Sequence, residues 1–176
     1  VYVHKDNPIA SLTMQQVDAI FSKTRKGGAA ADVRTWGDLG LTGDWAARPI
    51  SVYGRNSASG TYGFFKEHVL KNGDYRDQVK EQPGSASVVQ GVTEDRFGIG
   101  YSGIGYRTSA LRPVPLAAVQ GGRYVAPTFE TAMDGSYPLR RNLYLYINRA
   151  PKVTPPGPLA EYVKFALSRQ GQQIVV

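Results

Sequence analysis

The stretch Gly54-Arg55-Asn56-Ser57-Ala58-Ser59-Gly60-Thr61-Tyr62-Gly63-Phe64-Phe65 decides how this chain folds. Residues 49–53, directly before it, are β-branched and aromatic and predict a buried strand. Residues 61–71 place apolar side chains on one face and run into Asn72-Gly73, which predicts a helix and its end. A strand that leads through a loop of small residues into a helix has the geometry of an anion-binding site.

The residue types in this loop suit an anion. The first amides of a helix lack partners within the helix and carry the positive end of its dipole. Ser59 and Thr61 add hydroxyl groups there, and Gly60 lets a ligand approach the backbone closely. Arg55 supplies a forked, permanently charged donor. The alternative is an ordinary serine cap beside a surface arginine, and the stretch alone favours anion binding only slightly.

Two other motifs are excluded by counting residues. A Walker A loop has four residues between its glycines, followed by Lys and Ser or Thr. Here Gly54 and Gly60 enclose five residues, and Thr61 follows without a lysine. A nucleophile elbow requires Gly-x-Ser-x-Gly, and no serine of the stretch is flanked in that way.

Length and composition indicate one globular domain with a proper core. The chain has 176 residues, of which 41% are hydrophobic and 20% are charged. It has no cysteine, which excludes disulfides and thiolate metal sites, and no metal-ligand cluster is visible. No apolar run is as long as a membrane span, so we expect no membrane insertion. The chain opens on Val1-Tyr2-Val3, and we expect a fragment or processed product whose targeting signal is elsewhere.

The net charge of +7 raises the question of nucleic acid as a partner. The charge comes from 21 Lys and Arg against 14 Asp and Glu. The densest basic groups, residues 23–26 and 140–141, are not interleaved with aromatic residues as in a single-strand-binding platform. We therefore interpret both groups as solvated surface and expect no nucleic-acid partner.

The remaining segments alternate between strands and helices, which indicates an α/β fold in layers. Trp36 and Trp45 are expected to pack beneath a long connection. Residues 82–87 predict a second helix start, with Ser87 and Gln90 as a capping box; we favour an ordinary cap over a second contact to the same ligand. Strands are further expected at 1–5, 97–103, 113–119, 121–127 and 142–148, and helices at 12–21, from 87 and at 159–169.

Several short motifs occur in a fixed order from one end of the chain to the other. They are Val3-His4-Lys5-Asp6-Asn7-Pro8-Ile9, Leu12-Thr13, Ile20-Phe21, Thr35-Trp36-Gly37-Asp38-Leu39, the 54–61 stretch, Gly98-Ile99-Gly100-Tyr101, Tyr137-Pro138-Leu139, and Leu167-Ser168 with Gly171-Gln172. In this order they resemble the periplasmic phosphate-binding proteins (PstS) of bacterial phosphate ABC importers. That family consists of two-lobed type II periplasmic binding proteins that are not enzymes.

The resemblance implies a fold and a division of the chain. It implies a three-layer α/β/α lobe with a mixed sheet, followed by a C-terminal helix that would belong to the other lobe. Residues 6–144 would form lobe two, and residues 1–5 and 145–149 would cross between the lobes. Residues 150–176 would belong to an incomplete lobe one. Their helix at 159–169 places Leu159, Tyr162, Val163, Ala166 and Leu167 on its inner face, and without its lobe it would have to pack elsewhere or on another copy, or else expose that face.

The resemblance also implies the ligand and its contacts. The family motif of an arginine, three residues and Ser-Gly-Thr falls on Arg55, Ser59, Gly60 and Thr61, which would bind inorganic phosphate, with Asn56 and Ser57 in support. Many members have an aspartate two residues after the arginine. Ser57 stands there in this chain, so we expect a less tightly held guanidinium and a more positive site. The other half of the site would lie in lobe one, outside this chain.

The resemblance implies a periplasmic transport protein that delivers phosphate to the membrane permease of the importer and needs no cofactor. Another oxyanion, such as sulfate, arsenate or phosphonate, stays open as the ligand. One alternative function is an anion-binding or interaction module of a surface or adhesive protein. Another is a hydrolase using His4 or His68 with a serine, but neither histidine has a carboxylate at triad spacing, and no catalytic residue is assigned.

Overall fold

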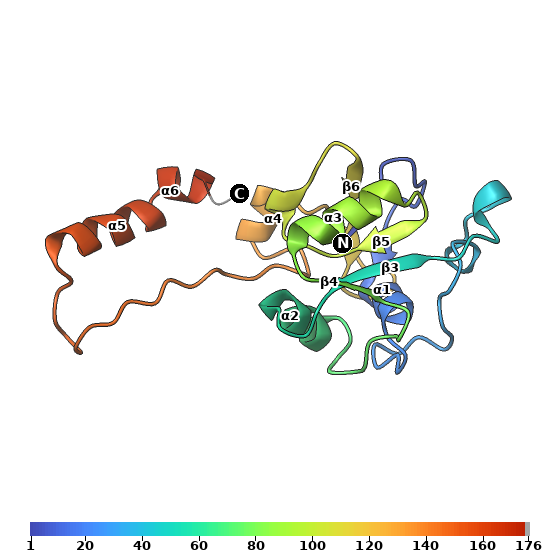
Figure 1. The fold of residues 1–176 in the computed structure, drawn as a ribbon, viewed down its shortest axis with the longest axis horizontal. Coiled ribbons are helices and arrows are strands. Elements are labelled where there is room, and N and C mark those ends of the chain that lie inside the picture. Colours follow the sequence, from blue (N-terminus) through green and yellow to red (C-terminus); the bar gives the residue numbers. More distant parts are fainter. Residues whose placement is uncertain (175–176) are drawn as a thin grey trace. The chain divides into compact units, whose positions relative to one another are not determined.

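The computed structural model describes residues 1–174 and divides the chain into two compact units, Val1–Arg140 and Arg141–Val176. The first unit is built on a five-stranded mixed sheet in the order β4-β3-β5-β1-β6 (Figure 1). Strands β3, β4 and β5 are parallel, whereas β1 pairs antiparallel with both β5 and β6. Their bounds are β1 Tyr2–His4, β3 Ser51–Arg55, β4 Lys80–Gln82, β5 Gly98–Gly100 and β6 Leu111–Pro113.

Successive strand residues face opposite sides of this sheet, so two separate clusters form. On one face, Tyr2 and Tyr53 pack with the buried valines of helix α3 (Ser85–Glu94), which contacts all five strands. Figure 1 shows α3 running across the sheet. Gly91 lets it approach closely, because a Cβ there would lie 2.5 Å from the Tyr53 ring.

The opposite face carries the larger core. Val3, Val52 and Ile99 point into it from the strands, and they meet helices α1 (Met14–Phe21) and α2 (Gly60–His68). Trp36 is completely buried in this cluster and meets Trp45 edge to face at 6.0 Å. The predicted packing role of both tryptophans is therefore confirmed, and so is the predicted α/β/α layering of this unit.

Helices α1 and α2 form where the sequence predicts helices. Thr13 caps α1, and a capping box joins its side chain and backbone to Gln16. Ser59 caps α2, which ends close to the predicted stop, where Lys71 and Asn72 adopt φ of 51° and 57°. The predicted capping box at Ser87 is wrong, because α3 begins at Ser85 with Gly84 as its cap.

The remaining elements of this unit are short. Strands β2 (Leu12–Thr13) and β7 (Leu116–Ala117) pair in parallel, and Leu116 also bridges to Val125. The two strands expected at 113–119 and 121–127 are thus reduced to a few paired residues. Three single-turn helices and one short α-helix complete the unit: η1 Gly37–Leu39, η2 Gly43–Trp45, η3 Ile104–Tyr106 and α4 Phe129–Met133.

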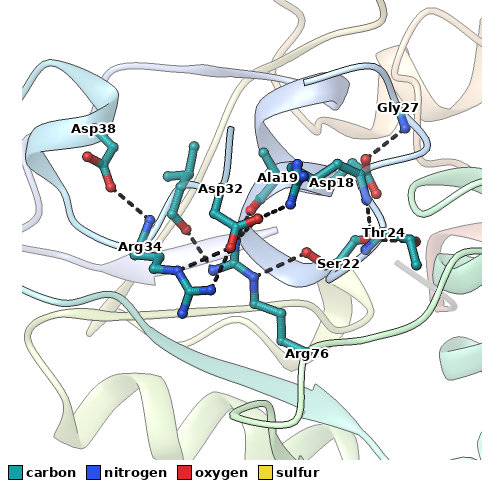
Figure 2. A network of polar contacts seen from close by, with 11 residues as sticks. Asp18, Ala19, Ser22, Thr24, Gly27, Asp32, Arg34, Asp38 and Arg76 are labelled. Carbon is teal, nitrogen blue, oxygen red and sulfur yellow. Dashed lines mark hydrogen bonds and ion pairs between the residues drawn. The ribbon is translucent and has the colours of Figure 1, made fainter. Parts of the chain in front are cut away.

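A buried arginine, Arg76, links the C-terminal end of α1 to the rest of this unit (Figure 2). The guanidinium of Arg76 donates to the carbonyls of Ala19, Ser22 (3.1 Å) and Val33 (2.8 Å). Asp32 lies 3.5 Å from the same guanidinium and also pairs with Arg25 and Arg34. Arg76 therefore satisfies helix-end carbonyls that α1 itself leaves without donors.

Asp18 lies beside this arrangement as a buried carboxyl group. One of its oxygens accepts a hydrogen bond from the Gly27 amide at 2.7 Å, and the other is buried without a partner. Burial raises the pKa of Asp18, although the Gly27 bond and nearby cations oppose the shift. The folded state therefore holds this proton more tightly than the unfolded state does.

A pH dependence of stability follows from this shift. Since the folded pKa is raised, Asp18 disfavours folding above that pKa, and the penalty disappears as the pH falls toward the unfolded value. We expect wild-type protein to gain stability relative to Asp18→Asn as the pH falls from neutral toward the reference carboxyl pKa of about 3.9. Urea unfolding of both proteins across this range measures the difference.

Asp38→Asn is the matched control for this experiment. The backbone amides of Thr35 and Arg34 lower the pKa of Asp38, so its contribution has the opposite sign and is lost as the pH falls. A difference between wild type and Asp18→Asn that stays constant with pH, while the Asp38 control responds, would contradict the assignment.

The second unit holds helices α5 (Gly157–Leu167) and α6 (Arg169–Ile174), which contact each other. The face predicted to lie inside is exposed, as expected where this helix finds no partner: no residue of α5 is buried, and Tyr162 and Leu167 are 57% and 70% exposed. The strand expected at 142–148 is also wrong, because this segment pairs with no strand of residues 1–174 and Tyr146 is 90% exposed. Both segments therefore present exposed apolar side chains.

Candidate functional site

The candidate site lies where three parallel strands end at one edge of the sheet. Strand β3 ends at Arg55, β4 ends at Gln82 and β5 ends at Gly100, with Arg55 in register with Gln82. Helix α2 starts five residues after β3, and α3 starts three residues after β4. Ligands of open α/β sheets bind outside the carboxyl ends of the strands, which is this edge.

Arg55 projects from the last position of β3 to the start of α3. Its Nη1 donates to Ser85 Oγ at 2.8 Å, and its Nη2 donates to the Pro83 carbonyl at 3.2 Å. Its Nε is buried without a hydrogen-bond partner. The guanidinium therefore links the loop that precedes α2 with the turn that precedes α3.

Ser59, Gly60 and Thr61 form the start of α2, with Ser59 as its cap. Ser59 Oγ accepts the Thr61 amide at 3.1 Å, and the Ser59 carbonyl accepts the Gly63 amide at 3.2 Å. Because Ser59 Oγ serves as an acceptor in the cap, its own proton remains a donor. Gly60 is exposed and Thr61 is half-buried, so this turn lies at the surface.

The two predicted supporting residues have different surroundings. Asn56 is half-buried and its backbone joins the two loops, since its amide donates to the Gln82 carbonyl at 3.1 Å and its carbonyl accepts the Ser59 amide. Ser57 is exposed.

Within residues 1–174, Arg55 forms no ion pair with a carboxylate. A half-buried cation at helix starts without an acidic partner favours an anionic ligand.

Sequence reasoning missed the residues that surround Arg55. The small-residue start at 82–87 was visible, but the contacts to Pro83 and Ser85 depend on β4 pairing beside β3. Behind the loop, the Tyr101 hydroxyl accepts the Arg55 backbone amide at 3.2 Å and lies 3.0 Å from the Tyr75 hydroxyl. No local pattern relates residues 55, 75 and 101, because only the folded sheet brings them together.

The two histidines of the hydrolase alternative have local partners. Nδ1 of His4 accepts the Asp6 amide at 3.2 Å. His68 stacks on Phe64, and its Nδ1 lies 3.0 Å from the Phe64 carbonyl.

Across residues 1–174, no three His, Cys, Asp or Glu side chains are grouped so that they could hold a metal ion. Over the same residues, no helix combines the length and the apolar character that a membrane crossing requires.

Comparison with known proteins places this arrangement in a family. The sequence profile of the PBP superfamily domain matches residues 1–170. This chain belongs to the PBP superfamily. The expected periplasmic-binding-protein-like fold is thereby confirmed.

Relatives within this superfamily are named for phosphate. The phosphate-binding protein PstS of Pseudomonas aeruginosa is 58% identical over 177 residues, which cover 100% of this chain and 54% of that protein. The phosphate-binding protein PstS of Staphylococcus haemolyticus is 31% identical over 177 residues, covering 98% of this chain and 51% of that protein. The chain thus spans about half the length of the curated relatives it matches.

A solved structure with a similar fold comes from Clostridium perfringens. It is described as a phosphate ABC transporter substrate-binding protein with bound phosphate. Its TM-score to this chain is 0.73 at 26% sequence identity, and the match covers 99% of this chain and 63% of that one. The resemblance inferred from the motifs of the sequence is therefore confirmed over nearly the whole chain.

Proposed function

We propose that this chain carries one half of an inorganic-phosphate site of a solute-binding protein that serves a phosphate ABC importer. The observation that carries the proposal is Arg55, a half-buried guanidinium without a carboxylate partner among the described residues, placed between the starts of α2 and α3. The names of the P. aeruginosa and S. haemolyticus relatives and the phosphate in the C. perfringens structure support phosphate as the anion.

Four residues would hold the phosphate. The Arg55 guanidinium would exchange its present bonds to Pro83 and Ser85 for charge-assisted bonds to phosphate oxygens. Ser59 would donate its hydroxyl proton, and Gly60 and Thr61 would present the positive end of α2. Asn56 would hold the loop between them through its backbone bonds.

We further propose the lobe division and the cellular role that go with this site. Residues 6–144 would be lobe two, residues 1–5 and 145–149 would cross between lobes, and residues 150–176 would belong to lobe one. The exposed apolar face of α5 supports this, because it needs a partner surface. The whole protein would work in the periplasm, hand phosphate to a membrane permease and catalyse no reaction.

Half of a site should bind phosphate weakly. Closure of two lobes excludes water and strengthens each charged contact, whereas an open half-site leaves the anion hydrated. We expect the 176-residue chain alone to bind phosphate with a Kd of ~1 mM or weaker, which is about −4 kcal/mol. An NMR titration of amide shifts with sodium phosphate at constant ionic strength measures this, with shifts expected at residues 55–61.

The protein as its native gene encodes it provides the comparison. Calorimetry of that protein is expected to show much tighter binding of phosphate than the 176-residue chain shows. Sulfate, the alternative oxyanion, is titrated in the same way for comparison. Micromolar binding by the 176-residue chain alone would refute the half-site. No shifts at residues 55–61, together with no phosphate binding by the native protein, would instead favour an interaction module of a surface protein.

A further inference from the structure

Two tyrosine hydroxyls form a buried hydrogen-bonded bridge between the two sides of the candidate site. The Arg55 amide donates to Tyr101 Oη at 3.2 Å, and Tyr101 Oη lies 3.0 Å from Tyr75 Oη. Tyr75 Oη in turn donates to the Tyr62 carbonyl at 3.0 Å. Arg55 ends β3 and Tyr62 lies in the first turn of α2, so the bridge spans the loop that carries Ser59.

The hydrogen bonds of this bridge all point in one direction, from the Arg55 amide to the Tyr62 carbonyl. The Tyr62 carbonyl is an acceptor, so the Tyr75 hydroxyl must give its single proton to that carbonyl. The bond between the two hydroxyls then requires Tyr101 as its donor. The Arg55 amide supplies the bond that Tyr101 accepts. Each hydroxyl therefore donates once and accepts once, and loss of either one breaks the bridge.

The rings that carry the two hydroxyls are held rigidly. Tyr101 is 3% exposed and stacks on Phe65 with ring centroids 3.8 Å apart, and Tyr75 stacks on Tyr62 at 4.5 Å. A side chain at Gly54 would disturb this arrangement, since its Cβ would lie 3.3 Å from the Tyr101 ring. Burial also raises the pKa of both phenols, which favours the protonated form that the bridge requires.

We propose that Tyr75 and Tyr101 are positioning residues for the ligand, which set the distance between the Arg55 guanidinium and the tip of α2 without touching the anion themselves. The inference rests on the proposed phosphate site. An anion held by both groups needs a fixed separation, because small displacements of charged donors weaken binding steeply. The bridge supplies that separation from behind the loop, where it does not compete with the ligand.

The test is calorimetry of phosphate binding by the native gene's protein carrying Tyr75→Phe, Tyr101→Phe or both. Each single change removes one hydroxyl and keeps the stacked ring. We expect each to weaken phosphate binding about tenfold, as for the loss of about one hydrogen bond. The double variant should lose little more than either single one, since residues that act as a unit are not additive.

Two measurements separate positioning from general stability. Tyr2→Phe is the matched control, because it removes a tyrosine-to-carbonyl bond of 3.0 Å, to Gly103, on the opposite face of the sheet. It should lower stability as the other variants do, yet bind phosphate as wild type does. Hydrogen exchange of the Arg55 amide should accelerate in both Tyr75→Phe and Tyr101→Phe and stay unchanged in the control.

The outcomes are distinct for the two proposals. Wild-type phosphate affinity in both bridge variants would overturn the positioning role and leave the phosphate site standing. Additive losses in the double variant, or equal losses in the Tyr2→Phe control, would overturn it as well. Absence of phosphate binding in the wild-type protein itself would overturn the proposed function and, with it, this inference.

Discussion

Arg55→Ala is expected to weaken phosphate binding by the native gene's protein by about a hundredfold or more. The estimate rests on two charge-assisted bonds, each contributing about 1.5–3 kcal/mol. Arg55→Lys keeps the charge but loses the planar fork, so it should retain part of the affinity, about tenfold below wild type. Calorimetry with inorganic phosphate measures all three proteins.

A change of overall charge must be separated from loss of this contact. Arg123→Ala is the matched control, because it removes the same charge at an exposed position. Its phosphate affinity should equal that of wild type. If Arg55→Ala bound phosphate as tightly as this control, the anion would bind elsewhere and the proposed site would be wrong.

Arg76→Met is expected to cost the largest amount of folding stability, about 3–5 kcal/mol. Arg76 is 8% exposed and donates to the carbonyls of Ala19 and Ser22 at the end of α1 and of Val33 in the connection that follows. Methionine fills a similar volume but offers no donor, so the Ser22 and Val33 carbonyls would lose their donor, and the Ala19 carbonyl would keep only the Val33 amide at 3.2 Å. The loss would be a large share of the 5–15 kcal/mol typical of a domain.

Urea unfolding measures this loss, with Lys23→Met as the control of equal charge. Lys23 pairs with Asp77 at 3.1 Å, but both side chains are at least half exposed. Such surface pairs contribute about 0–1 kcal/mol. Equal unfolding free energies for the two variants would show that Arg76 does not fasten α1.

The elements that sequence patterns predict well are those with local causes. The capping box of Thr13 and Gln16 starts α1 through contacts between residues only three positions apart. The strand that ends at Arg55 follows from the β-branched and aromatic side chains of its own segment. The layered fold follows from the alternation of such elements. The same patterns placed Arg55, Ser59, Gly60 and Thr61 at one strand-to-helix turn, as the structure has them.

The features that sequence patterns could not predict depend on pairing between distant segments. Arg55 reaches Ser85 because β3 lies beside β4, and it reaches Tyr101 because β3 also lies beside β5. The strand expected at 142–148 shows that a local pattern alone does not make a strand. Its residue types suit a strand, but a strand needs a neighbour, and none pairs with it within residues 1–174.

The position of β1 inside the sheet has a consequence for how the chain folds during synthesis. Tyr2 pairs with Gly100 and with Pro113, so β1 can join the sheet only after segments about a hundred residues further along the chain have been made. At about 5–20 residues per second, a ribosome would finish β6 roughly 5–20 s after β1. Through that interval Tyr2 and Val3 would lack these strand neighbours on the nascent chain. A chaperone that binds such unpaired segments would therefore act on the segment that contains β1.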